Sequence, residues 1–148
     1  MRPDFLGVLI AGAFCVGCGV STRPAPAAAS SEAALSKPWQ EARDRGVEFR
    51  AVGQEPGWFL EIDTEKQMRI VYDYGEHEAI TRVTQPARHD DTTTYEAVTG
   101  AHRVRVVIDD RPCRDVMSGE AFPHGVVVRI DDRTLHGCGR NLAAKGRP

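Results

Sequence analysis

Residues 47–63, which read VEFRAVGQEPGWFLEID, decide the fold. Apolar side chains stand at every second position from Val47 to Ala51, and they do so again from Trp58 to Ile62. This period of two is typical of β-strands that bury one face. The intervening GQEPG contains the glycine and proline that favour a tight turn. The stretch therefore predicts two antiparallel strands joined by a hairpin.

The same alternation recurs along the rest of the chain. It is found in residues 68–72, less regularly in 79–84, and then in 95–99, 104–108, 126–130 and 134–138. Turn-forming residues separate these segments, and most connections have hairpin length. We predict an all-β domain over residues 47–142 and a disordered tail over 143–148. About eight antiparallel strands would form a small meander barrel or a tight sandwich, because closure removes exposed strand edges.

Composition excludes some classes of protein. The 148 residues leave room for one domain once a leader and a linker are subtracted. Lysine and arginine number 19 against 21 acidic residues, for a formal net charge of −2, and the arginines alternate with carboxylates. A nucleic-acid binder would carry a basic excess or a basic stripe. We therefore expect no nucleic-acid partner.

The N-terminus has the layout of a secretion signal. Residues 5–16, FLGVLIAGAFCV, form an apolar run too short to span a bilayer as a helix, which takes about 20 residues. The following Gly17-Cys18 completes a sequence that resembles the bacterial lipobox, with Cys15 where leucine is usual. We expect residues 1–17 to be a lipoprotein signal peptide and Cys18 to carry the lipid. The alternative is an ordinary signal peptide cut near residues 25–29, which releases a soluble periplasmic protein.

Residues 18–46 are expected to be the lipidated N-terminus and a flexible tether. Gly19 stands where inner-membrane lipoproteins carry aspartate, which favours the outer membrane, facing the periplasm. Residues 21–36, STRPAPAAASSEAALS, have no apolar period with which to bury surface. Residues 37–45 favour a single helical turn, with Pro38 early in it. Trp39 either packs on the domain or lies near the membrane interface.

One connection, residues 109–124, is longer than a hairpin loop and contains Cys113. Long connections inside small domains are usually functional or cross-linked. The other cysteine of the mature domain is Cys138, so an exported protein is expected to form a Cys113–Cys138 disulfide. A redox-active pair is the alternative, but the spacing is not that of a C-x-x-C motif.

Four short motifs resemble those of a family of uncharacterised bacterial envelope lipoproteins. They are GQEPGW at 53–58, CRDVMS at 113–118, Pro123-His124, and GCG at 137–139. The family pattern is roughly GxEPFW, CxDxMS, PH and GCG, and this chain departs from it at Gly57, where an aromatic residue is usual. The resemblance spans about residues 49–140. It implies a small β-barrel module located in the cell envelope, with no assigned activity.

The same motifs have structural interpretations. Gly53 and Gly57 would permit positive φ in a turn stiffened by Pro56, and Trp58 would plug the core at the barrel mouth. Glu55 is alternatively a functional carboxylate.

In the long connection, Asp115 and Ser118 would cap a short helical turn over residues 117–122. None of the five histidines shows paired ligand spacing, so we expect no metal site and no cofactor.

These observations favour a non-enzymatic, lipid-anchored envelope protein. Its β domain would bind or scaffold a small apolar ligand or another envelope protein, with the 109–124 connection as the recognition surface. The candidate binding residues are Glu55, Trp58, Asp115, Ser118 and His124.

Two other functions stay open. One is an inhibitor of host lysozyme, because residues 118–122 and 95–100 partly match the SGxxY and YxxxTKG motifs of such proteins. The other is a hydrolase, with Ser118 as nucleophile and His124 or His136 as base.

Overall fold

The computed structural model describes residues 35–100 and 102–142. Its elements in chain order are α1 Lys37–Asp44, β1 Phe49–Gln54, β2 Gly57–Asp63, β3 Gln67–Tyr72, the 3-10 helix η2 Asp73–Gly75, β4 His77–Arg82, β5 Ala87–His89, β6 Thr92–Thr99, β7 His102–Asp109, β8 Cys113–Arg114, β9 Ala121–Phe122, β10 His124–Ile130 and β11 Arg133–Asn141.

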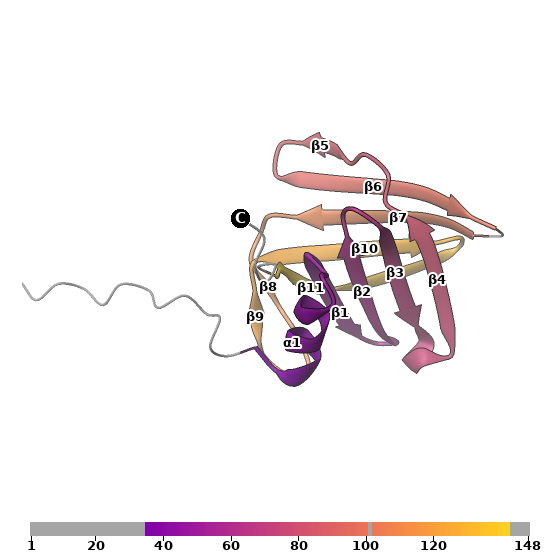
Figure 1. Cartoon of the computed structure of the whole chain (residues 1–148). Coiled ribbons are helices and arrows are strands. Elements are labelled where there is room, and N and C mark those ends of the chain that lie inside the picture. The colour runs from indigo at the N-terminus through magenta and orange to yellow at the C-terminus, as the bar shows by residue number, and fades with distance from the viewer. Residues whose placement is uncertain (1–34, 101, 143–148) are drawn as a thin grey trace, which may run out of the picture. The chain divides into compact units, whose positions relative to one another are not determined.

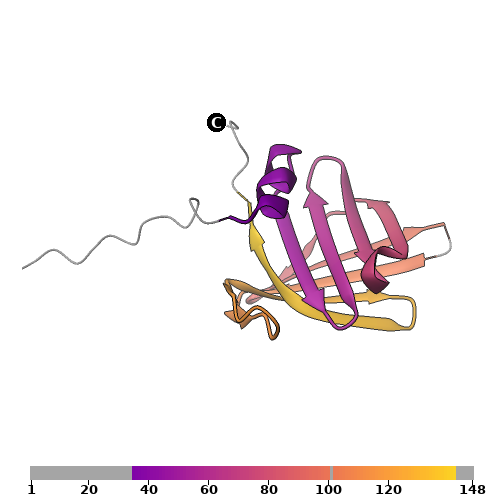
Figure 2. The same cartoon turned by 90° about the horizontal axis from the view of Figure 1, so that it is seen from below.

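The prediction of an all-β, antiparallel fold is confirmed. Nine strands form one sheet in the order β4-β3-β2-β1-β11-β10-β7-β6-β5. This is more than the expected eight, because the short strand β5 has no clear period in the sequence. The sheet curls into a half-barrel, as Figures 1 and 2 show. The remaining two strands, β8 and β9, pair only with each other within the connection between β7 and β10.

The inner face of the sheet holds the main core. Alternate residues of each long strand point inward, and those of β2 and β10 are almost completely buried. The cluster comprises Phe49, Ala51, Trp58, Leu60, Ile62, Met68, Ile70, Tyr72, Tyr95, Ala97, Val104, Val106, Ile108, Val126, Val128, Ile130 and Leu135. These side chains fill the inside of the curl.

The end strand β4 and the part of β6 that β5 leaves unpaired meet through side chains. Thr99 Oγ1 donates to the carbonyl of Ile80 at 2.8 Å, and Thr84 Oγ1 donates to the carbonyl of Glu96 at 2.8 Å. Each bond satisfies a backbone acceptor at a sheet edge, where a ladder partner is missing. The half-barrel is therefore joined at this seam by threonines.

A second apolar cluster lies on the outer face. Helix α1 buries Trp39 and Ala42 there, against Phe122 of β9 and Cys138 of β11. The rings of Trp39 and Phe122 are 5.4 Å apart, and Trp39 is only 7% exposed. The helix predicted here is present and, with eight residues, is longer than the single turn expected, and Trp39 packs on the domain. Leu35 and this helix already pack on the sheet, upstream of Val47 where the strand pattern begins.

Candidate binding groove

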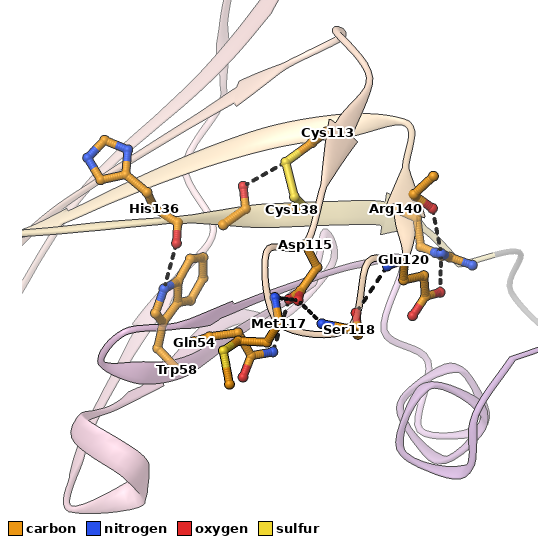
Figure 3. The surroundings of a disulfide bond; sticks show 12 residues. Gln54, Trp58, Cys113, Asp115, Met117, Ser118, Glu120, His136, Cys138 and Arg140 are labelled. Atoms are coloured by element: carbon orange, nitrogen blue, oxygen red, sulfur yellow. Dashed lines mark hydrogen bonds and ion pairs between the residues drawn. A yellow bond between two sulfur atoms is a disulfide. The ribbon is translucent and has the colours of Figure 1, made fainter.

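A disulfide fixes the long connection to the sheet. Cys113 and Cys138 are bonded, with Cα atoms 5.5 Å apart, as predicted. Because Cys138 is in β11, the bond holds one limb of residues 110–123, the cross-linked loop, against the outer face (Figure 3). The other limb is held by Phe122 in the second apolar cluster.

Asp115 organises the tip of the cross-linked loop. Its Oδ1 accepts hydrogen bonds from the backbone N–H groups of Met117 and Ser118, both at 2.8 Å. Its Oδ2 accepts from Gln54 Nε2 at 3.0 Å, which ties the tip to β1 (Figure 3). The predicted helical turn over residues 117–122 is wrong: residues 116–118 form a hydrogen-bonded turn around Asp115, and residues 121–122 are strand β9. Gly119, with φ +71°, reverses the chain before a helix can propagate.

The environment of Asp115 favours its ionised form. Burial opposes ionisation, but the hydrogen bonds from Ser118, Gln54 and Met117 outweigh it and lower the pKa of Asp115 below its ordinary value of 3.8. A group with a lowered folded pKa stabilises the fold above its unfolded pKa, and the effect is lost as pH falls through the folded pKa. The tip of the loop should therefore loosen in acid.

We expect Asp115→Asn to destabilise the domain by about 1–2 kcal/mol at neutral pH, because an amide NH₂ would face the Gln54 NH₂. Amide hydrogen exchange of residues 116–119 should rise. The variant and the parent chain should converge as pH falls below 3.8 and through the lower folded pKa of Asp115. Asp90→Asn, at a side chain that is 85% exposed, is the matched control and should change neither quantity. Equal protection of the tip in both variants at neutral pH would contradict this role.

A groove of about 510 Å³ lies between the cross-linked loop and the sheet. Its floor comes from Val107, Gly125 and Val127 on the neighbouring strands β7 and β10. The complete lining is Gly53, Gln54, Glu55, Val107, Asp109, Cys113, Arg114, Asp115, Val116, Gly125, Val126, Val127, His136, Gly137 and Cys138. We call this feature the outer groove. Its volume is within the range of about 300–1,000 Å³ that is usual for ligand sites.

Two apolar side chains stand in solvent beside the outer groove. Val116 is 89% exposed and Met117 is 68% exposed, both at the tip that Asp115 organises. Large apolar side chains held in solvent on an ordered loop are typical of recognition surfaces.

Trp58 lies beneath one wall of the outer groove and is 4% exposed. Its Nε1 donates to the carbonyl of His136 at 3.2 Å (Figure 3). The indole passes so close to Gly53 that a Cβ there would lie 2.0 Å from Nε1, and a Cβ on Gly137 would lie 2.7 Å from Cζ2. Two glycines on different strands thus make room for one indole.

The expectation of positive φ at Gly53 and Gly57 is wrong. Neither residue is among the positive-φ glycines, because both continue the strands β1 and β2. The absence of a side chain at these positions lets another ring approach the backbone closely. Gly53 leaves room for the indole of Trp58. Gly57 leaves room for the ring of Tyr74, because a Cβ added at Gly57 would lie 2.8 Å from Tyr74 Cδ1.

Glu55 is an exposed carboxylate at one end of the outer groove. Its Oε2 accepts a hydrogen bond of 3.0 Å from the hydroxyl of Tyr74, and this bond raises the pKa of Tyr74. Sequence reasoning missed Tyr74. The sequence did contain a sign of its position. Asp73 and Gly75 on either side of Tyr74 mark a tight turn, and Gly57 stands where the family pattern has an aromatic residue, which leaves space for a ring from elsewhere.

The remaining candidates are not assembled with Glu55 and Asp115. His124 is two residues before Val126 in β10, so its side chain is on the same, inner side of the strand. Its ring is 5.8 Å from that of Phe49 in the inner core. Its Nδ1 lies 2.9 Å from Asp110 Oδ1. Ser118 lies in the loop on the outer face, where its Oγ accepts from the backbone N–H of Glu120 at 3.2 Å. Within residues 35–100 and 102–142, Ser118 Oγ and the His124 ring therefore have different partners and form no Ser–His pair.

The segments that resemble lysozyme-inhibitor motifs bury their aromatic rings in different places. Tyr95 belongs to the inner core and is 8% exposed. Phe122 belongs to the second apolar cluster and is 4% exposed. Neither ring is presented to a partner at the surface.

Among residues 35–100 and 102–142, no group of three or more histidine, cysteine or acidic side chains is arranged to hold a metal ion. No helix in the same ranges is long and apolar enough to cross a membrane. Cys18 and the expected signal peptide, tether and tail segments 1–34 and 143–148 are outside the described residues.

Comparison with known proteins adds no relative: no protein-family model, curated protein or solved structure matches this chain at a significant level.

Proposed function

We propose that this protein is a lipid-anchored component of the bacterial cell envelope whose β domain binds a partner without catalysing a reaction. The outer groove is its recognition surface. One observation carries the proposal: a disulfide holds an ordered loop over an apolar groove and leaves Val116 and Met117 in solvent. A loop that is ordered before binding loses little conformational entropy when a partner docks.

The anchor is tested by metabolic labelling with a fatty acid. We expect the label on the parent chain and on Cys15→Ser, and none on Cys18→Ser, because Cys18 follows the small residue of the lipobox-like sequence. Label that survives in Cys18→Ser would remove the anchor from the proposal. An unlabelled parent chain recovered in the soluble periplasmic fraction would do the same.

The binding surface is tested by crosslinking in intact cells. A photoreactive residue at position 116 is expected to give a discrete adduct, and the further change Val127→Asp should abolish it by placing a charge on the groove floor. The matched control position is Val98, an apolar residue of β6 that is 73% exposed and is not part of the groove lining. Equal adducts from positions 116 and 98 would contradict the proposal.

A non-catalytic role is tested on purified protein. Hydrolysis of ester, peptide or glycan substrates that disappears in Ser118→Ala or Glu55→Gln would overturn it, because Ser118 is the candidate nucleophile and Glu55 is a carboxylate of the groove lining.

A further inference from the structure

The outer groove has chemically different walls. Its floor is apolar, at Val107 and Val127. Glu55 lies in the β1–β2 turn, whereas Arg114 lies in the cross-linked loop, where its Nη1 donates to the carbonyl of Gly119. An occupant therefore meets a carboxylate at one place, a guanidinium at another, and hydrocarbon between them.

Tyr74 extends the groove beyond Glu55. Tyr74 is 72% exposed, and the Cδ1–Cε1 side of its ring is packed against Gly57. The ring is held in place at both ends of the residue: its hydroxyl donates to Glu55, and its backbone is in a left-handed turn with φ +56° that follows Asp73 at φ +52°. The electron-rich face of an aromatic ring attracts cations, and a neighbouring carboxylate strengthens that attraction.

The charged residues around Tyr74 also favour a cationic ligand. The neighbouring turns β3–β4 and β10–β11 are joined by the ion pair of Asp73 with Arg133. The carboxylates that these turns contribute are those of Asp73, Glu76, Asp131 and Asp132. Facing them are Arg133, Arg103 beside Asp131, and the imidazoles of His77, 3.6 Å from Asp73, and His102, 2.7 Å from Asp131. Carboxylates outnumber fixed cations here, so a cation approaching Tyr74 is attracted and an anion is repelled.

We propose that the outer groove binds an extended segment of a partner protein, with an apolar side chain over Val127 and an ammonium or guanidinium group against Tyr74 and Glu55. This inference rests on the proposed function of the groove and names the chemistry of its partner. An extended peptide fits because successive side chains can reach the apolar floor and the Tyr74 ring, which lies outside the groove lining.

The test uses synthetic pentapeptides with blocked ends as probes. Each contains one leucine and one lysine, adjacent or separated by one or two alanines, and a parallel set has glutamate in place of lysine. Binding to the purified full-length chain is followed by NMR titration. We expect the best lysine peptide to bind about five- to tenfold more tightly than its glutamate counterpart, because a cation–π contact and an exposed ion pair each contribute a few-fold in affinity.

Four variants locate the binding. Val127→Asp should abolish binding of every peptide, and Val98→Asp, the matched control, should leave all affinities unchanged. Tyr74→Asn and Glu55→Gln should reduce the lysine preference to less than about twofold. Both replacements preserve the local structure, because asparagine tolerates positive φ and glutamine still accepts a hydrogen bond from the Tyr74 hydroxyl.

Different results overturn different statements. Peptides that bind in a Val127-dependent manner without preferring lysine would overturn this inference and leave the groove as a recognition surface. No binding by any peptide, with the protein instead sedimenting with purified peptidoglycan or forming a dimer through the groove, would also overturn it. Lysine preference that persists in Val127→Asp would contradict both the inference and the proposed function of the groove.

Discussion

Replacing Gly137 with alanine is expected to destabilise the domain by more than about 3 kcal/mol, which corresponds to a fall in Tm of at least about 12 °C. The added Cβ would lie 2.1 Å from the carbonyl oxygen of Val52 and 2.7 Å from Trp58 Cζ2. One obstacle is backbone in the adjacent strand and the other is a buried indole, so neither can move aside cheaply. Thermal unfolding followed by circular dichroism measures the effect.

Gly125→Ala is the matched control for this prediction. Gly125 is also a strand glycine, but an added Cβ there would meet only Asp109 Cβ, at 3.9 Å. The free energy of unfolding of Gly125→Ala should therefore differ from that of the parent chain by less than about 1 kcal/mol. A Tm for Gly137→Ala close to that of Gly125→Ala would show that the indole does not need the space between Gly53 and Gly137.

The double variant Cys113→Ser/Cys138→Ser is expected to lose about 3.5 kcal/mol of stability. The two cysteines are 25 residues apart, and the chain-entropy model gives a stabilisation of this size for a loop of that length. Tm should fall by about 15 °C. Because the same bond holds the cross-linked loop on β11, hydrogen exchange at residues 113–119 should rise more than exchange in β3 or β4.

Reduction of the parent chain provides the internal control. After treatment with a thiol reductant, its Tm should approach that of the double variant, and the reductant should leave the variant unchanged. Equal Tm values for the oxidised parent and the double variant would contradict a stabilising disulfide.

Features carried by local pattern were predictable from the sequence. Alternation of apolar residues identified the long strands, because one buried face imposes a period of two on any strand. The disulfide was predictable because the folded domain contains just two cysteines, Cys113 and Cys138. The turn at Asp115 was predictable because an aspartate side chain readily accepts bonds from backbone N–H groups two and three residues ahead.

Features that depend on distant residues were not predictable in the same way. The role of Gly53 follows from Trp58, whose Nε1 bonds to a carbonyl 78 residues away. Strands β8 and β9 are two residues each, too short to show a period. The position of His124 is different: it is two residues before the inward residue Val126 in the same strand, so the sequence did indicate that its ring lies near the inner core.

The single-layered sheet has a consequence for how this protein can diversify. Val106 and Val107 are neighbours in β7, yet the first belongs to the inner core and the second to the floor of the outer groove. Mutations at the outward positions 107 and 127 can therefore alter which partners bind while the core-forming positions 106 and 126 continue to specify the fold. Close homologues should accumulate differences preferentially at the outward positions, and a library randomised at those positions should yield many folded variants with altered binding.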